Sequence, residues 1–140
     1  MVRFRGGVAH YLTRRNVTQK DMLIMDYQGS CHCGAITFSF SMPEIDTGLK
    51  CNCSLCQKKN AMMSNFTLSL NELTIESKGD ALSTYTFGSN IAKHHFCRVC
   101  GIYPFHQTLR KPGHYRINLT CIDNLDLSSL NVEYFNGRAL

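Results

Sequence analysis

The sequence predicts a mainly β fold, a single domain of short antiparallel strands, and three observations support this prediction. Apolar and polar residues alternate with period two in several short segments, which is typical of half-buried strands. No segment keeps a helical period of 3.6 residues over three turns. The chain of 140 residues has the length of one domain and contains no internal repeat.

The expected strands follow one another from Tyr27 onwards. The clearest early strand is 35–42, which alternates apolar and polar residues and ends at Pro43, and the clearest late strand is 115–122. Further strands are expected at 66–70, 73–75, 82–87 and 132–135. We expect a loop at 51–56 and one short helical turn at 57–63.

The basic charge of the chain gathers in its first 24 residues. These hold five Lys and Arg residues against Asp21 alone, whereas the remainder holds ten basic and nine acidic residues. The remainder therefore lacks the continuous basic face that nucleic acid binding requires. We predict a basic, disordered extension over 1–24, a folded domain over 25–140, and no nucleic acid partner.

The sequence contains no apolar run long enough for a bilayer-spanning helix, so we expect no membrane partner. The first 25 residues lack the continuous apolar region of a secretory signal peptide. We therefore predict a soluble, cytoplasmic protein, in a compartment where thiols stay reduced.

Seven of the eight cysteines lie in three compact clusters: Cys31 and Cys33; Cys51, Cys53 and Cys56; Cys97 and Cys100. Thiolates grouped at these short spacings are typical zinc ligands. A Cys-x-Cys pair is also a poor start for two separate disulfides, because its sulfurs share one side of the backbone. We predict two zinc ions per chain, in two sites of different character.

The first predicted site combines the outer clusters, Cys31 and Cys33 with Cys97 and Cys100. Four thiolates close the coordination sphere of zinc, so this site has a structural role. A glycine directly follows Cys33 and Cys100, as the tight turn of a zinc knuckle requires. An ion here joins segments more than sixty residues apart and contributes folding free energy on the order of 10 kcal/mol.

The second predicted site has three thiols, Cys51, Cys53 and Cys56, and no obvious fourth ligand. Zinc with three protein ligands leaves one position for a substrate, which favours a catalytic or ligand-binding role. An exogenous thiol bound there loses its proton near neutral pH and stays nucleophilic. A fourth ligand would make this site structural as well; the candidates are Cys121, His94, His95, His106 and His114.

Cys121 lies in the predicted strand 115–122, where a free cysteine is more often a small buried apolar residue than a ligand. His32 points away from the face of Cys31 and Cys33, so we expect it to be exposed. Several cations can either meet an anionic substrate or be ordinary solvated charges: Lys58, Lys59, Arg110, Lys111 and Arg116. We assign no role to any one of them and predict no individual catalytic residue.

Three motifs together resemble the glutathione-dependent formaldehyde-activating family, whose domain also occurs in centromere protein V. They are Gly29-Ser30-Cys31-His32-Cys33-Gly34-Ala35-Ile36, Cys51-Asn52-Cys53-Ser54-Leu55-Cys56 and Phe96-Cys97-Arg98-Val99-Cys100-Gly101. The resemblance covers about Tyr27 to Gly137. Asn52 stands where several members carry His, and Asn60 near a position often given to Gly.

The resemblance implies a tent-like β fold with a structural zinc on Cys31, Cys33, Cys97 and Cys100 and a second zinc on Cys51, Cys53 and Cys56. It also implies a carbon–sulfur lyase activity, in which the thiol of glutathione adds to formaldehyde to give S-(hydroxymethyl)glutathione. The expected partners are thus a small-molecule thiol and an aldehyde. The motifs contain the expected metal ligands, but they do not identify the substrate.

Two other functions are alternatives to this enzyme. A non-catalytic zinc-stabilised module that binds protein or chromatin remains the alternative, and only the basic extension favours it. A zinc nucleobase deaminase needs a Glu near the first ligand and a Pro before a Cys-x-x-Cys pair. Here Phe96 precedes Cys97 and no Glu adjoins a cysteine, so the deaminase is excluded.

Overall fold

The computed structural model describes residues 23–139 and arranges their strands in three small sheets. The first sheet has the order β1 (Ile24–Ser30), β2 (Ile36–Pro43), β5 (Thr74–Ser77). The second has the order β10 (Asn131–Phe135), β3 (Thr47–Cys51), β4 (Met63–Ser64). The third has the order β6 (Leu82–Tyr85), β7 (Lys93–Cys97), β8 (Phe105–Gln107), β9 (Tyr115–Ile117).

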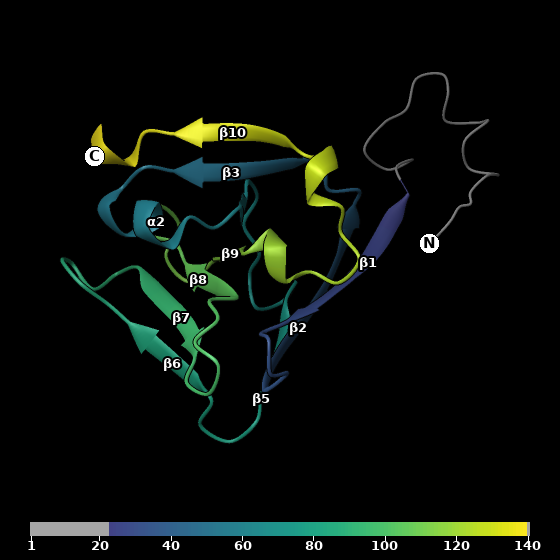
Figure 1. Cartoon of the computed structure of the whole chain (residues 1–140), viewed down its shortest axis with the longest axis horizontal. Helices are drawn as coiled ribbons and strands as arrows, with labels where there is room; N and C mark the ends of the chain where they lie inside the picture. The colour runs from purple at the N-terminus through teal and green to yellow at the C-terminus, as the bar shows by residue number, and fades with distance from the viewer. Residues whose placement is uncertain (1–22, 140) are drawn as a thin grey trace.

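The three sheets face one another like the sides of a triangle (Figure 1), with β3 and β10 across the top, β1 and β2 on the right and β6 and β7 at the lower left. The strand pairs within the sheets are antiparallel, except that β10 pairs with β3 in parallel. The predicted mainly β fold is therefore confirmed. Short antiparallel strands were predicted, and the parallel pair is the exception; it brings the C-terminal strand beside the cysteine at the end of β3.

The core lies between the sheets. Strand β2 directs Ile36, Phe38 and Phe40 inward, as its alternation predicts, and all three are buried. Phe105 from β8 is fully buried and meets Phe38 edge-on, with 6.0 Å between ring centroids. The first and third sheets therefore share one apolar interior, which fixes the turns at their ends.

Helix α2 (Ser54–Lys59) begins three residues earlier than the predicted turn at 57–63, so the predicted loop 51–56 is partly helical. Cys53 is its N-cap, because the Cys53 side chain accepts a hydrogen bond from the Cys56 backbone N–H. Asn60 ends the helix in the left-handed conformation, with φ of 53°. Cys56 consequently lies on the helix and Cys53 at its start.

The predicted strand 115–122 is shorter in the structure. Strand β9 ends at Ile117, and Asn118 caps a 3₁₀ turn, η2 (Leu119–Cys121), by accepting a hydrogen bond from the Thr120 N–H. The predicted strand 66–70 is reduced to one bridge between Leu68 and Tyr115. The alternation of apolar and polar residues predicted strands that were too long in both places. Local side-chain hydrogen bonds and a turn take the place of the expected strand pairing.

The remaining elements are short. Strands β3, β7 and β8 were not predicted as strands and have five, five and three residues, too few for a reliable period-two pattern. Two further 3₁₀ turns are η3 (Leu127–Ser129) and η4 (Gly137–Ala139). Within residues 23–139 no helix is long and apolar enough to span a bilayer. The predicted extension 1–24 lies almost entirely outside the described residues and stays a prediction.

Candidate functional site

The four outer cysteines come together in one cluster, with their Sγ atoms within 4.8 Å of one another. Cys31 and Cys33 lie in the turn after β1, and Cys97 ends β7 just before Cys100. The Sγ of Cys33 lies 3.7 Å from the Sγ atoms of both Cys31 and Cys97. Ligands of a tetrahedral zinc with bonds of about 2.3 Å stand about 3.8 Å apart, so the spacing fits such an ion.

The backbone around this cluster has the conformation expected of a zinc knuckle. Gly34 and Gly101 have φ of 84° and 80°, a region that favours glycine, as predicted. The Ile36 N–H donates to the Sγ of Cys31 at 3.3 Å, and the Cys100 N–H donates to the Sγ of Cys97 at 3.4 Å. Such donors stabilise the negative charge of thiolate ligands. The cluster joins the first sheet to the third.

The other three cysteines form a second cluster, in which the Sγ atoms also lie within 4.8 Å of one another. Cys51 comes from the end of β3, and Cys53 and Cys56 from the start and first turn of α2. The Cys53 N–H donates to Cys51 Sγ at 3.4 Å, and the Cys56 N–H to Cys53 Sγ at 3.3 Å. Burial, followed by contact with Cys53, raises the pKa of Cys56 well above its ordinary value. Either cluster can hold a metal ion.

No fourth His, Cys, Asp or Glu joins the second cluster among residues 23–139. Cys121 instead donates to the Tyr103 carbonyl at 3.8 Å, and burial raises the pKa of its thiol to about 11. Both ring nitrogens of His95 are hydrogen-bonded, to Thr84 and Gln107. His32 is exposed, as predicted.

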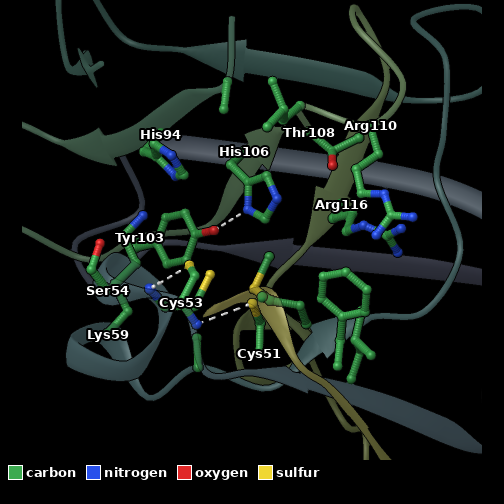
Figure 2. Close-up of a pocket in the computed structure, with 18 of the residues that line it drawn as sticks. Cys51, Cys53, Ser54, Lys59, His94, Tyr103, His106, Thr108, Arg110 and Arg116 are labelled. Carbon is green, nitrogen blue, oxygen red and sulfur yellow. Dashed lines mark hydrogen bonds between the residues drawn. The ribbon is translucent and has the colours of Figure 1, made fainter. Parts of the chain in front are cut away.

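A cavity of about 310 Å³ opens beside the second cluster and is lined by all three of its cysteines. Figure 2 shows Cys51 and Cys53 in this cavity with His94, His106 and Tyr103 across from them. His94 and His106 therefore face the cluster across the cavity but lie outside its group of ligand atoms. Much of the remaining wall is apolar, as in most small-molecule sites.

Tyr103 and His106 form a pair on the cavity wall. Their rings are nearly parallel, at 7° with centroids 5.9 Å apart, and the Tyr103 hydroxyl shares a hydrogen bond with His106 Nδ1. Burial lowers the pKa of His106 to about 3, so its imidazole is neutral at physiological pH. Burial and the nearby cysteine charges raise the pKa of Tyr103, which keeps its phenol proton.

Lys59 covers the other part of this wall. Its Nζ lies 3.1 Å from the centroid of the Tyr103 ring, in a cation–π contact. Burial lowers the pKa of Lys59 to about 8, and the charges of Cys56 and Cys53 act in the opposite direction. Lys59 thus places a cation beside the phenol and near the thiols.

Two arginines line the cavity as well. Arg116 on β9 is half-buried and donates to the Ser64 carbonyl at 3.0 Å. The Arg110 guanidinium carbon lies 4.7 Å from the centroid of the Phe135 ring. In Figure 2 both arginines lie on one side of Cys51, and Tyr103 and Lys59 lie on the other.

The C-terminal end of the described chain is packed against the second cluster. Strand β10 brings Phe135 into register with Cys51. Arg138 donates from its Nε to the Asn52 carbonyl at 2.8 Å and from its backbone N–H to Asn52 Oδ1 at 3.0 Å. This segment therefore holds the loop that carries the three thiols.

The glutathione-dependent formaldehyde-activating enzyme family matches residues 26–138. The chain belongs to this family. The structure is also similar to the crystal structure of a Rhodobacter sphaeroides protein, with 30% sequence identity and a TM-score of 0.64. That match covers 76% of this chain and 99% of the Rhodobacter chain. The tent-like fold implied by the resemblance is thus confirmed, and the two cysteine groups are consistent with zinc in this family.

Sequence reasoning grouped the cysteines correctly in space but missed the residues around them. Tyr103 and His106 were not connected, because nothing in their spacing reports a shared hydrogen bond. Of the five cations considered, Lys59, Arg110 and Arg116 line the cavity, whereas Lys58 and Lys111 are exposed and do not. Helical spacing could have separated Lys59 from Lys58, since Lys59 lies three residues after Cys56 on α2.

Proposed function

We propose that this protein is a zinc-dependent enzyme of the carbon–sulfur lyase type that joins a low-molecular-weight thiol such as glutathione to a small aldehyde such as formaldehyde. One observation carries the proposal: three cysteines, which no fourth described ligand residue completes, line a cavity of about 310 Å³. The choice of glutathione as the thiol and formaldehyde as the aldehyde follows from the name of the family to which the chain belongs. The expected product is S-(hydroxymethyl)glutathione.

We assign Cys31, Cys33, Cys97 and Cys100 to a structural zinc and Cys51, Cys53 and Cys56 to the zinc of the reaction. Zinc at the second cluster supplies an open position for the substrate thiol and lowers the pKa of that thiol. Cys51, Cys53 and Cys56 would hold the ion at the cavity wall, and the backbone N–H groups of Cys53 and Cys56 keep the Cys51 and Cys53 sulfurs oriented.

The Tyr103 hydroxyl is the proton donor in this proposal. When the thiolate sulfur forms its bond to the aldehyde carbon, the carbonyl π electrons move to oxygen, and this oxygen takes the Tyr103 proton. His106 shares a hydrogen bond with the same hydroxyl, and its neutral imidazole restores the phenol by giving a proton from Nδ1 while Nε2 takes one. The reverse sequence releases the aldehyde, with the phenolate taking the proton back.

The surroundings of Tyr103 favour this role. Its phenol stays protonated until the product alkoxide develops, because burial raises its pKa. The Lys59 ammonium over the ring stabilises the phenolate that forms after the transfer. The apolar part of the wall limits water around the aldehyde, which strengthens these electrostatic effects.

The rate of adduct formation from glutathione and formaldehyde tests the proposal. With metal-replete protein we expect a rate above the spontaneous one and proportional to protein concentration, measured by ¹³C NMR with labelled formaldehyde. Cys53→Ser should return the rate to background, while Arg98→Gln, at an exposed arginine paired with Asp80 and outside the cavity, should not change it. A wild-type rate equal to the spontaneous rate contradicts this substrate pair.

A further inference from the structure

Arg116 carries a positive charge that the protein itself leaves largely unmatched. A guanidinium has five N–H donors, and the hydrogen bond that the structure gives this one is to the Ser64 carbonyl, at 3.0 Å. The side chain is half-buried on β9 and lines the cavity. Its pKa is lowered by burial and then by the charge of Arg110, so the two arginines repel each other. A partner anion would stabilise a partly buried cation in this position, and among the protein's own groups the Cys51 charge acts in that direction.

The protein supplies no carboxylate for this purpose. The cavity lining includes no Asp and no Glu. Within residues 23–139 the one ion pair is that of Arg98 with Asp80, two exposed side chains outside the cavity. Arg110 is held over the Phe135 ring, which places its charge at the cavity without neutralising it.

The thiolates of the second cluster cannot neutralise all of the positive charge in the cavity. Three thiolates with one Zn²⁺ carry a net charge of −1, whereas Lys59, Arg110 and Arg116 bring three positive charges to the cavity. Lys59 lies over Tyr103, apart from the arginines. The arginine side of the cavity therefore keeps a positive surplus, which an anionic group of the ligand can neutralise.

We propose that Arg116 and Arg110 form a carboxylate-binding subsite for the thiol substrate, which therefore must carry an acid group away from its sulfur. The inference rests on the proposed function, which places the thiol at the second cluster; Arg110 and Arg116 lie to one side of Cys51 in the same cavity (Figure 2). The planar guanidinium fork matches a carboxylate with two parallel hydrogen bonds. A neutral thiol gains no such contact, so the subsite selects among thiols.

Calorimetric titration of zinc-loaded protein tests the subsite with three probes: glutathione, its diethyl ester and S-methylglutathione. We expect wild type to bind glutathione about tenfold or more tightly than the diester, because the ester removes the charge-assisted contacts. Arg116→Gln should lose this preference by weakening glutathione and leaving the diester unchanged. Arg110→Gln should reduce the preference in part, and Arg98→Gln, the matched control, should keep it whole.

The outcomes separate the subsite from the proposed reaction. S-methylglutathione should still bind Arg116→Gln more weakly than wild type, since it keeps its carboxylates and has no free thiol. Equal binding of glutathione and S-methylglutathione contradicts thiol coordination but keeps the subsite. Equal binding of glutathione and its diester to wild type, binding of neither, or equal weakening of both in Arg116→Gln overturns the subsite. Arg116→Lys keeps the positive charge and should retain part of the preference for glutathione over its diester. If Arg116→Gln does not fold, an unchanged preference in Arg110→Gln overturns the subsite and a reduced one supports it.

Discussion

Gly137 lies directly against Cys51, and the contact leaves no room for a side chain. A Cβ built on Gly137 would stand 2.5 Å from the Sγ of Cys51 and 2.9 Å from the Cβ of Cys53. The parallel pairing of β10 with β3 creates this approach, because it ends with Phe135 beside Cys51. The last described turn of the chain therefore controls the space around a proposed zinc ligand.

Gly137→Ala should displace the Cys51 sulfur and remove the second metal ion while the first remains. Atoms as close as 2.5 Å cannot persist, and the Cys51 sulfur, near the end of β3, is a less constrained partner than the backbone. We expect about one zinc per chain in place of two and an unchanged β-rich circular dichroism spectrum, with zinc measured by atomic emission. Gly88→Ala is the control: it strains a residue with φ of 61° but meets no atom within 4 Å, so it should keep both ions. Two zinc ions in Gly137→Ala would contradict the close packing.

The two cysteine clusters should respond differently to removal of one thiol. Cys97→Ser breaks the cluster that joins segments 64 residues apart, so it should leave an unfolded or insoluble chain. Cys53→Ser should remain folded and lose one of two zinc ions, because its cluster lies within one short segment, from the end of β3 to the first turn of α2. Metal content and thermal unfolding of both variants check this. Equal collapse of both variants would mean that both ions are structural.

The local part of the fold was predictable because it depends on neighbouring residues. Strand β2 alternates since one face buries Ile36, Phe38 and Phe40. The parallel pair of β10 with β3 was not predictable in this way, since its two strands are distant in the sequence; Asn52 and Asn136, which are hydrogen-bonded just beyond it, are 84 residues apart. No local pattern reports which distant strand becomes a neighbour.

The same distinction holds at the site. Thiol spacing shows which cysteines can share an ion, because ligands close in sequence are close in space. The contact of Lys59 with Tyr103 and the approach of Gly137 to Cys51 exist only after three sheets have assembled. Cys53 as a helix cap was missed for another reason: its sulfur replaces the oxygen of the usual capping residues.

Phe105→Ala should destabilise the protein by about 3–5 kcal/mol. Phe105 is fully buried and contacts Phe38, His95 and Tyr115 with centroids 6.0, 5.6 and 5.7 Å away, so truncation leaves a cavity between the sheets. Urea unfolding followed by circular dichroism measures the change. Leu70→Ala, at a residue that is 64% exposed, should change stability by no more than about 0.5 kcal/mol. Similar effects of the two substitutions would contradict the shared core.

Acid should destabilise the fold in part through His106. Its pKa falls from the ordinary 6.5 in the unfolded chain to about 3 in the fold, so the folded state binds fewer protons between these values. The stabilisation is fully present above pH 6.5 and is lost as pH falls, by about 1.4 kcal/mol for each pH unit at most. His106→Asn should therefore show a smaller decrease in unfolding free energy from pH 6.5 to 4.5 than wild type. Equal slopes in wild type and His106→Asn would contradict the low pKa.

Tyr103→Phe should lower kcat for adduct formation about 100-fold or more, because the phenol supplies the proton for the developing alkoxide. The ring, its stacking on His106 and the Lys59 contact remain, so zinc content and the Kd of glutathione should stay within about twofold of wild type. The pH profile should also change, since the variant loses the group that titrates at high pH. Tyr134→Phe, at a tyrosine that is 82% exposed, is the matched control and should keep the wild-type rate. A Tyr103→Phe enzyme with unchanged kcat would show that solvent protonates the oxygen, and a parallel loss of zinc would show that Tyr103 supports the metal site instead.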